Sequence, residues 1–372
     1  MPAQRSQDRP HDLVVIGAGI VGLACAWRAA QAGLSVAVLE RDEPGAGASG
    51  VAAGMLAPVT EADFGERELL ALNLESRAEW PGFAAELSER SGLATGYAES
   101  GALVVAADRD DAEELRRLHA FQAQLGLEVE WLAPSAAREL EPGLSPRVGG
   151  AILAARDGHV DPPAVLAALV AALAEAGVSV RNRTEAVALE TAGGRVVGVR
   201  TAAGDVVRGD RALVAAGAWS AQGELGAEAL APEVRPLKGQ LLELAVRPGR
   251  AAPARRLIRT PRCYVVIRAD GRVVIGATTE EQGFDTTVTA DGVFRLLEAA
   301  YEVLPDVAEL ELVRARAGLR PATPDNVPVI EAGAIDGLVW ATGHGRNGVL
   351  LAPVTARRVL GLVGAGERVG GR

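Results

Sequence analysis

The sequence predicts an α/β fold with two domains: a Rossmann-type nucleotide-binding domain assembled from discontinuous segments, and a second α+β substrate domain built on an antiparallel sheet. A strand, a glycine-rich turn and a helix open the chain, and strand-helix patterns return in the middle and near the end. Short strands joined by tight turns lie between them. The predicted nucleotide-binding domain covers 12–83, 151–222 and 316–365, and the predicted substrate domain covers 84–150 and 223–315.

The composition fits a globular protein and argues against nucleic acids and anionic membranes as partners. Of the 372 residues, 49% are hydrophobic, enough for a large buried core. A net charge of -10 argues against a nucleic-acid or anionic-membrane partner, because both require a basic surface. No apolar run is long enough to span a bilayer, and we expect no transmembrane segment. Two scattered cysteines fit a cytoplasmic location, and four scattered histidines indicate no metal site.

The opening motif GAGIVG at 17–22 is a GxGxxG fingerprint. Gly17 permits a tight turn, Gly19 lets a pyrophosphate approach the backbone, and Gly22 lets helix and strand pack closely. The free N–H groups at the helix N-terminus would bind the phosphates. Glu40, about twenty residues further on, would accept hydrogen bonds from the ribose hydroxyls. The flanking strand, helix and strand are expected at 13–16, 20–32 and 35–40.

Further elements follow from hydrophobic periodicity and turn residues. Helices are expected at 66–90, 110–124, 162–176, 291–304 and 350–362. Strands are expected at 101–106, 179–181, 187–190, 196–201, 206–207, 211–216, 241–244, 264–268, 272–276 and 338–341.

Several motifs carry a resemblance to a known family. The segment 41–56, which contains SGVAAGML, and the segment AAGAWS at 215–220 resemble flavin-contacting loops of the D-amino-acid oxidase superfamily. The C-terminal motifs AGLRP at 317–321, TPD at 323–325 and GHGRNG at 343–348 are most similar to the glycine oxidases of thiamine biosynthesis. The resemblance runs from Leu13 to about Leu362. It implies that the nucleotide-binding domain binds FAD.

The resemblance also implies which residues hold the FAD. Monomeric sarcosine oxidases of this superfamily tether their flavin through a cysteine close to the position of Leu319 and Arg320, where this chain has none. We therefore expect non-covalent binding. The implied cofactor-binding residues are Gly17, Gly19, Ile20, Val21, Gly22, Glu40, Arg41, Ala48, Ser49, Ala53, Gly54, Met55, Ala186, Gly217, Trp219, Gly343, His344, Gly345, Arg346, Asn347, Gly348 and Val349.

Substrate recognition is expected to depend on an arginine. A carboxylate beside an amine is best held by a planar guanidinium that donates two parallel hydrogen bonds. By resemblance, Arg320 binds the substrate carboxylate, Tyr264 adds a hydrogen bond, and Arg346 lines the site. Arg262 and Thr279 stand where comparable glycine oxidases carry His and Met, so the accepted substrate can differ.

The implied reaction is oxidative deamination of a small amino acid, with glycine the first candidate. Hydride would pass to flavin N5, dioxygen would reoxidise the flavin with formation of hydrogen peroxide, and the imine would serve thiazole formation in thiamine biosynthesis. No catalytic side chain is expected, because the cofactor carries the chemistry. The alternatives are a D-amino-acid or sarcosine oxidase, an amino-acid dehydrogenase with a quinone acceptor, and a non-catalytic dinucleotide-binding sensor. A homo-oligomer is expected.

Overall fold

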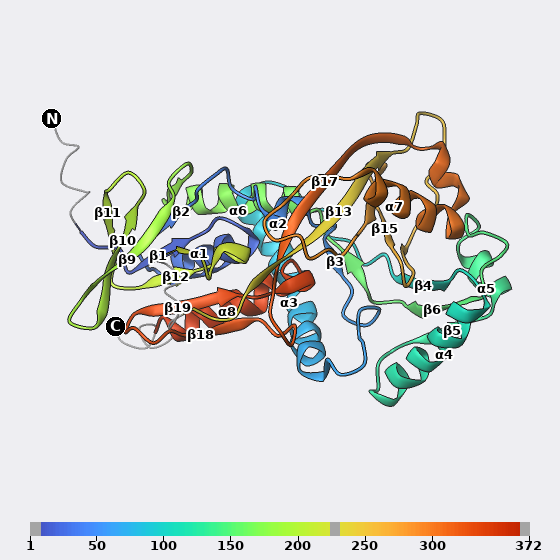
Figure 1. Ribbon diagram of the computed structural model, residues 1–372, viewed down its shortest axis with the longest axis horizontal. Helices are drawn as coiled ribbons and strands as arrows, with labels where there is room; N and C mark the ends of the chain where they lie inside the picture. The colour runs from blue at the N-terminus through green and yellow to red at the C-terminus, as the bar shows by residue number, and fades with distance from the viewer. Residues whose placement is uncertain (1–8, 224–230, 365–372) are drawn as a thin grey trace.

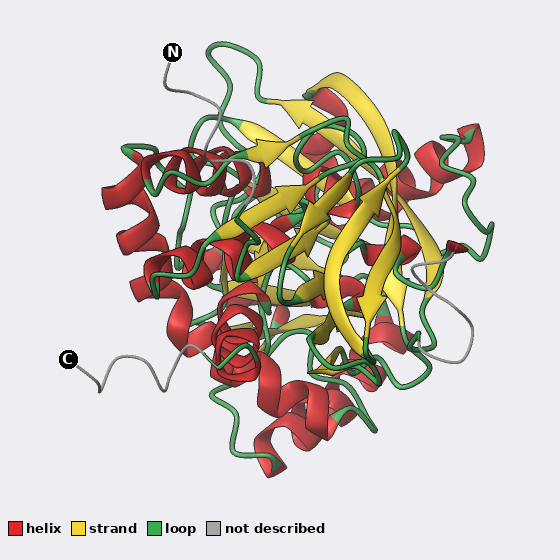
Figure 2. Cartoon of the chain, turned by 90° about the vertical axis from the view of Figure 1, so that its left-hand side faces the viewer, coloured by secondary structure: helices red, strands yellow, loops and turns green. Residues whose placement is uncertain are grey.

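The computed structural model describes residues 9–223 and 231–364. Two large sheets form the two ends of an elongated molecule, and the chain passes between them several times (Figure 1). Strands lie in the interior and helices lie mainly around them (Figure 2). The predicted mixed α/β class with a second, antiparallel sheet is confirmed.

The first sheet has the strand order β18-β19-β12-β1-β2-β8. All neighbours pair in parallel except the edge strand β18, which is antiparallel to β19. Its strands come from distant parts of the chain, which agrees with a domain of discontinuous segments. The bounds are β1 (Leu13–Ile16), β2 (Val36–Leu39), β8 (Val180–Arg181), β12 (Ala212–Val214), β18 (Val329–Ala332) and β19 (Leu338–Thr342).

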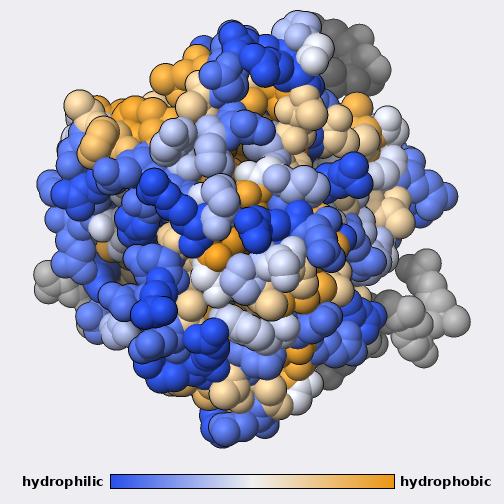
Figure 3. Space-filling view, turned by 90° about the vertical axis from the view of Figure 1, so that its right-hand side faces the viewer, coloured by the Kyte–Doolittle hydropathy of each residue, from blue (hydrophilic) through white to orange (hydrophobic). Residues whose placement is uncertain are grey.

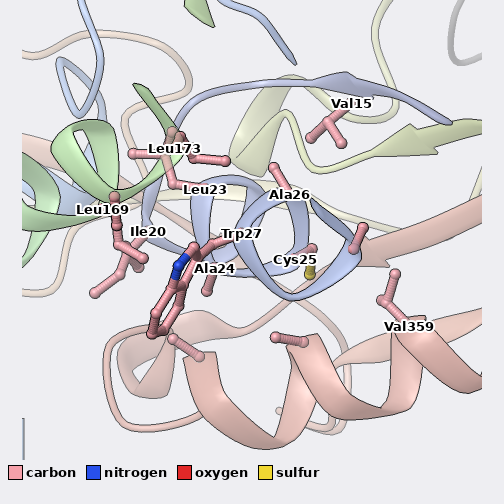
Figure 4. Close-up of a cluster of buried hydrophobic side chains, with 14 of the residues drawn as sticks. Val15, Ile20, Leu23, Ala24, Cys25, Ala26, Trp27, Leu169, Leu173 and Val359 are labelled. Atoms are coloured by element: carbon pink, nitrogen blue, oxygen red, sulfur yellow. The ribbon is translucent and has the colours of Figure 1, made fainter. Parts of the chain in front are cut away.

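Helices cover one face of this sheet, and their contact forms the largest core. Trp27 and Leu23 are buried between α1, α6 and α8, together with Leu169 and Val359 (Figure 4). Alanine-rich sequences let these helices approach closely. The helices of this layer are α1 (Ile20–Gln31), α3 (Arg67–Ser91), α6 (Pro162–Glu175) and α8 (Ala352–Leu362).

A three-stranded antiparallel meander covers the opposite face. It consists of β9 (Ala186–Ala192), β10 (Arg195–Thr201) and β11 (Val206–Arg208), as the turn signals predicted. Val196 and Val199 of the meander pack on Val14 and Trp340 of the sheet. The parallel sheet is thus buried on both faces, which explains the continuous hydrophobic sequence of its strands.

The second sheet is larger and mostly antiparallel, with the order β17-β13-β16-β15-β14-β4-β6-β5. The long strands β13 and β17 run diagonally between the two ends of the molecule (Figure 1). The outer face at this end is mainly hydrophilic, with separate hydrophobic patches (Figure 3). The strands are β4 (Ala102–Ala106), β5 (Glu130–Leu132), β6 (Gly150–Ala154), β13 (Arg235–Ala245), β14 (Leu257–Arg259), β15 (Tyr264–Ile267), β16 (Arg272–Gly276) and β17 (Glu311–Ala322).

Short elements and three helices complete the chain. The helices α4, α5 and α7 belong to the half of the molecule that contains the second sheet. The bounds are α2 (Ala48–Val51), β3 (Met55–Leu56), α4 (Arg109–Gln124), α5 (Pro134–Leu140), β7 (Gly158–His159), η1 (Gly217–Trp219), α7 (Ala290–Val303), η3 (Pro305–Glu309) and η4 (Gly345–Asn347).

The structure differs from two of the predicted domain boundaries. Residues 151–154 lie in β6, which pairs with β4, and residues 316–322 lie in β17, which pairs with β13. Both segments were assigned to the nucleotide-binding domain but belong to the second sheet. Periodicity identifies a strand without showing which sheet it joins. Residues 224–230 and 365 of the predicted domains lie outside the described residues.

A glycine-to-alanine substitution tests how tightly the first turn packs. A Cβ atom on Gly22 would lie 2.0 Å from the carbonyl oxygen of Gly17. We expect Gly22→Ala to lower the free energy of unfolding by about 1–3 kcal/mol, because backbone must move. Gly361, in the exposed part of α8, meets no atom within 4 Å and is the matched control. Gly361→Ala should stabilise by up to ~1 kcal/mol; equal effects in urea unfolding would contradict the packing argument.

Candidate active site

A large cavity of about 960 Å³ adjoins both sheets. Its lining includes the turn after β1, the α2 segment, η1, and residues of β13, β15 and β17. All the predicted site residues line it except Gly22, Gly343 and Asn347. Those three residues lie behind or beside lining residues. Gly22 packs on Gly17, Gly343 has a positive φ of 75°, and Asn347 is buried.

The turn between β1 and α1 brings backbone groups to one wall of the cavity. Gly17 has a φ of 103°, and a Cβ atom there would lie 2.5 Å from the carbonyl oxygen of Ala215. Ile20 and Val21 open helix α1 and line the cavity, and the Ile20 N–H donates to Ser49 Oγ at 3.0 Å. A helix N-terminus at a cavity wall without bulky side chains fits a pyrophosphate group.

Glu40 has a structural role that the sequence did not reveal. Its Oε2 accepts a hydrogen bond from the Ala18 N–H at 2.7 Å, and its Oε1 accepts one from the Asp42 N–H at 2.9 Å. The carboxylate therefore fixes the glycine turn as well as lining the cavity. Because each oxygen can accept more than one hydrogen bond, Glu40 can still bind ribose hydroxyls.

Aromatic and cationic side chains line the cavity beyond Glu40. The Arg41 guanidinium lies over the Trp219 ring at 4.5 Å, and Trp219 lies 5.6 Å from the Phe284 ring. Ala186, from the first strand of the meander, lines the same cavity. Flat apolar surfaces next to a carboxylate that can accept hydrogen bonds suit the nucleoside end of a dinucleotide.

Tyr264 and Arg320 come together where β13, β15, β16 and β17 form another wall of the cavity. Arg320 lies within β17, and its Nη1 donates to the Thr278 carbonyl at 3.1 Å. A Cβ atom on Gly239 would lie 2.4 Å from the guanidinium, and one on Gly276 would lie 2.3 Å from the Tyr264 hydroxyl. Two glycines therefore make the space that both side chains occupy.

Electrostatics link these two residues. Burial raises the pKa of Tyr264, and the adjacent positive charge of Arg320 partly opposes that shift. Tyr264 thus stays protonated at neutral pH and can donate a hydrogen bond. Arg320 forms no ion pair with any carboxylate of the described chain, so its charge is available to an anionic ligand.

Arg346 is held differently. It lies in η4, lines the cavity, and pairs with Glu66 through both terminal nitrogens, one at 3.2 Å. Asn326 Nδ2 donates to the same carboxylate at 2.8 Å. Burial raises the pKa of Glu66, but the interactions with Arg346 outweigh it and the pKa lies below its usual value. The charge of Arg346 is therefore already balanced by a protein carboxylate.

Apart from Arg346, the loop formed by the GHGRNG motif at 343–348 carries no positive charge at neutral pH. His344 Nε2 contacts Thr355 Oγ1 at 2.9 Å, and burial lowers the pKa of this histidine to about 4. His344 is therefore neutral at pH 7. The loop continues through Val349 into helix α8, whose N-terminal dipole favours negative charge nearby.

Sequence reasoning missed several lining residues. Glu61, Arg259 and Cys263 border the cavity, as do Arg262 and Thr279, the two departures noted in the sequence. The Arg262 side chain forms an ion pair with Glu302. Glu61 lies in a loop and Arg259 in the short strand β14, and no motif marks either residue. The one signal for Arg259 is its place in a run of arginines from Arg250 to Arg262 that could attract anionic substrates.

The described residues hold no cluster of three His, Cys, Asp or Glu side chains that could bind a metal ion. Within 9–223 and 231–364, no helix has the length and hydropathy needed to cross a membrane.

The comparisons with known proteins define the class. Residues 12–361 match the family model described as FAD dependent oxidoreductase, and the chain belongs to that family. FAD is therefore its cofactor, and the glycine turn, Glu40, the α2 segment and the η4 loop are the parts of the cavity that fit it.

Particular relatives cover nearly the whole chain. A glycine oxidase of Geobacillus kaustophilus is 35% identical, over 95% of this chain and 93% of its own. The crystal structure of glycine oxidase from that organism has a TM-score of 0.88 at 34% identity, over 95% and 94% of the two chains. An iminodiacetate oxidase of Chelativorans sp. BNC1 has a TM-score of 0.84 at 30% identity, over 94% and 95% of the two chains.

A further relative is longer than this chain. A bifunctional protein ThiO/ThiG of Trichormus variabilis is 34% identical over 93% of this chain. The match covers 51% of that protein, so this chain spans about half its length.

Replacing Glu40 tests its double role. Glu40→Ala removes the ribose acceptor and the partner of two backbone N–H groups. We expect the dissociation constant of FAD to rise roughly 10- to 100-fold, the equivalent of hydrogen bonds to a charged group. Fluorescence titration of apoprotein with FAD measures this, and Glu40→Gln, which keeps one acceptor oxygen, should be affected less. An alanine variant that binds FAD as tightly as wild type would contradict the assignment.

Proposed function

We propose that the chain uses FAD to oxidise a small amino acid, with glycine as the first candidate. The observation that carries this proposal is the pairing of Arg320 with Tyr264 in the FAD cavity, with no protein carboxylate on Arg320. An unpaired guanidinium and a protonated hydroxyl are the partners that a substrate carboxylate requires. The likeness to glycine oxidases over almost the whole chain supports the same substrate class.

The residues of the chain bind and orient the substrate. Arg320 and Tyr264 hold its carboxylate, one through a charged guanidinium and the other through a protonated hydroxyl. Bound FAD would supply a two-electron acceptor: after the substrate ammonium has lost a proton to solvent, its lone pair would form the C=N bond as hydride leaves Cα, which gives a protonated imine. Reoxidation by dioxygen with release of hydrogen peroxide is part of the proposal, as is use of the imine for thiazole formation, which the likeness to ThiO/ThiG supports.

An N-substituted amino acid is a second candidate substrate. Thr279 is small and exposed at the cavity, where the comparable glycine oxidases carry the larger Met. The likeness to an iminodiacetate oxidase fits such a substrate. A panel of glycine, sarcosine, iminodiacetate and D-amino acids, assayed with oxygen and with a quinone, distinguishes these substrates and both acceptors.

FAD should be bound without a covalent link. Cys25 is buried in α1, and residues 317–321 contain no cysteine. After acid precipitation and centrifugation, we expect the yellow colour in the supernatant, with free FAD treated in parallel as the control. Colour that stays with the pellet would contradict non-covalent binding.

Arg320 is the most direct test of substrate recognition. Arg320→Ala leaves the substrate carboxylate without its partner, and we expect kcat/KM to fall about a hundred- to several-thousand-fold, the equivalent of roughly 3–5 kcal/mol. Arg320→Lys keeps the charge but loses the planar donor pair, so it should recover only part of the activity. Flavin content should remain normal in both.

A control lies on the same strand. Arg314 pairs with Glu243 at 2.7 Å and does not line the cavity. Arg314→Ala should leave kcat/KM unchanged. If Arg320→Ala oxidised amino acids like the wild type, the carboxylate would be bound elsewhere, and Arg259 would be tested next.

A further inference from the structure

Glu61 is a buried residue at the cavity whose carboxylate forms no ion pair within the described chain. Its residue is 6% exposed and lines the cavity. The side chain has no hydrogen bond or ion pair with residues 9–223 or 231–364. Burying a carboxylate without a partner is strongly unfavourable. Because Glu61 lines the cavity, its carboxylate can accept hydrogen bonds from a cationic group of a ligand that enters it.

Neither neighbouring cation forms an ion pair with Glu61. Arg346 directs both terminal nitrogens to Glu66, and Arg259 donates to the Thr60 carbonyl. The charge of Glu61 nevertheless acts on Arg346 and on Tyr264, where it favours the protonated forms. Glu61 therefore lies close enough to interact electrostatically with Tyr264 and with Arg346 of the 343–348 loop.

The loop that carries Glu61 is fixed from several sides. Asp157 accepts hydrogen bonds from two backbone N–H groups of 57–62, at 3.4 and 2.8 Å. Gln122 Nε2 donates to a carbonyl of the loop at 2.9 Å, and Arg259 donates to another. The Glu61 N–H itself closes a turn at 3.0 Å. The carboxylate is thus held in place before any ligand arrives, as a recognition group must be.

We propose that Glu61 binds the ammonium group of the substrate. The proposal rests on the function proposed above, because it supplies the second half of a site for a zwitterion. Arg320 and Tyr264 bind the carboxylate end, and Glu61 binds the cationic end. This arrangement selects amino acids over carboxylates of the same size that lack an amine, since those would leave Glu61 buried and unpaired.

The test separates amine binding from carboxylate binding. Glu61→Gln keeps the shape of the side chain and removes its charge. We expect kcat/KM for glycine, or for the best amino acid of the panel, to fall roughly 10- to 100-fold through KM. The inhibition constant of acetate, which has the carboxylate but no amine, should stay the same or decrease, because a negative charge has left the cavity.

Two further variants complete the experiment. Glu61→Asp retains the charge but moves it away from the ligand, because the side chain is one methylene shorter. Its kcat/KM for the amino acid should lie between those of the wild type and Glu61→Gln. Asp63→Asn removes one negative charge from the neighbouring surface outside the cavity and should change neither constant. FAD content and thermal unfolding temperature, measured for each variant, show whether the cavity remains intact.

The outcomes are distinct. A parallel loss of amino-acid turnover and acetate binding in Glu61→Gln would show a structural role and overturn the proposal, as would no change in either. If the wild-type protein oxidised no amino acid at all, the proposed function would fail first, and a role for Glu61 in amine binding would fail with it.

Discussion

The shape of the cavity depends on glycines in its walls, because neighbouring groups lie where a Cβ atom would otherwise be. At one wall, the carbonyl of Ala215 comes so close to Gly17 that no Cβ would fit; at another, Gly239 and Gly276 leave room for the Arg320 guanidinium and the Tyr264 ring. The first arrangement brings a helix N-terminus to the wall of the cavity, where it would bind the phosphates of FAD. The second places a cation and a hydroxyl on strands rather than on loops, where packing fixes their positions. Larger residues at these glycines would fill the cavity from both sides.

Some charged residues of the cavity have an ionic partner in the protein and others have none, and the second group indicates the kind of ligand. Arg346 is balanced by Glu66, and Arg262 by Glu302, while Arg320 and Glu61 have no ionic partner within the described chain. A site that presents an available cation and an available anion is complementary to a zwitterion.

Local signals predicted the nucleotide-binding half well, because a strand, a turn, a helix and an acidic residue follow one another within residues 12–40. The second sheet was less predictable. The charged first half of β17 shows no alternation, since its first residues are exposed, so its pairing with β13 could not be inferred. The position of Glu61 depends on hydrogen bonds that its loop forms with Gln122, Asp157 and Arg259. These residues are far away in sequence, and no motif marks Glu61. The double role of Glu40 likewise required the turn geometry.

The central claim is that this cavity brings an amino acid to FAD for oxidation. Anaerobic titration of the yellow protein with glycine, sarcosine, iminodiacetate and D-amino acids, followed by the visible absorbance of oxidised FAD, tests it most directly. The account predicts that at least one amino acid bleaches the absorbance, that the corresponding carboxylate without an amine does not, and that admitting an electron acceptor restores the colour. If no member of the panel reduced the flavin of the intact wild-type protein, the assignment as an amino-acid oxidising enzyme would be contradicted.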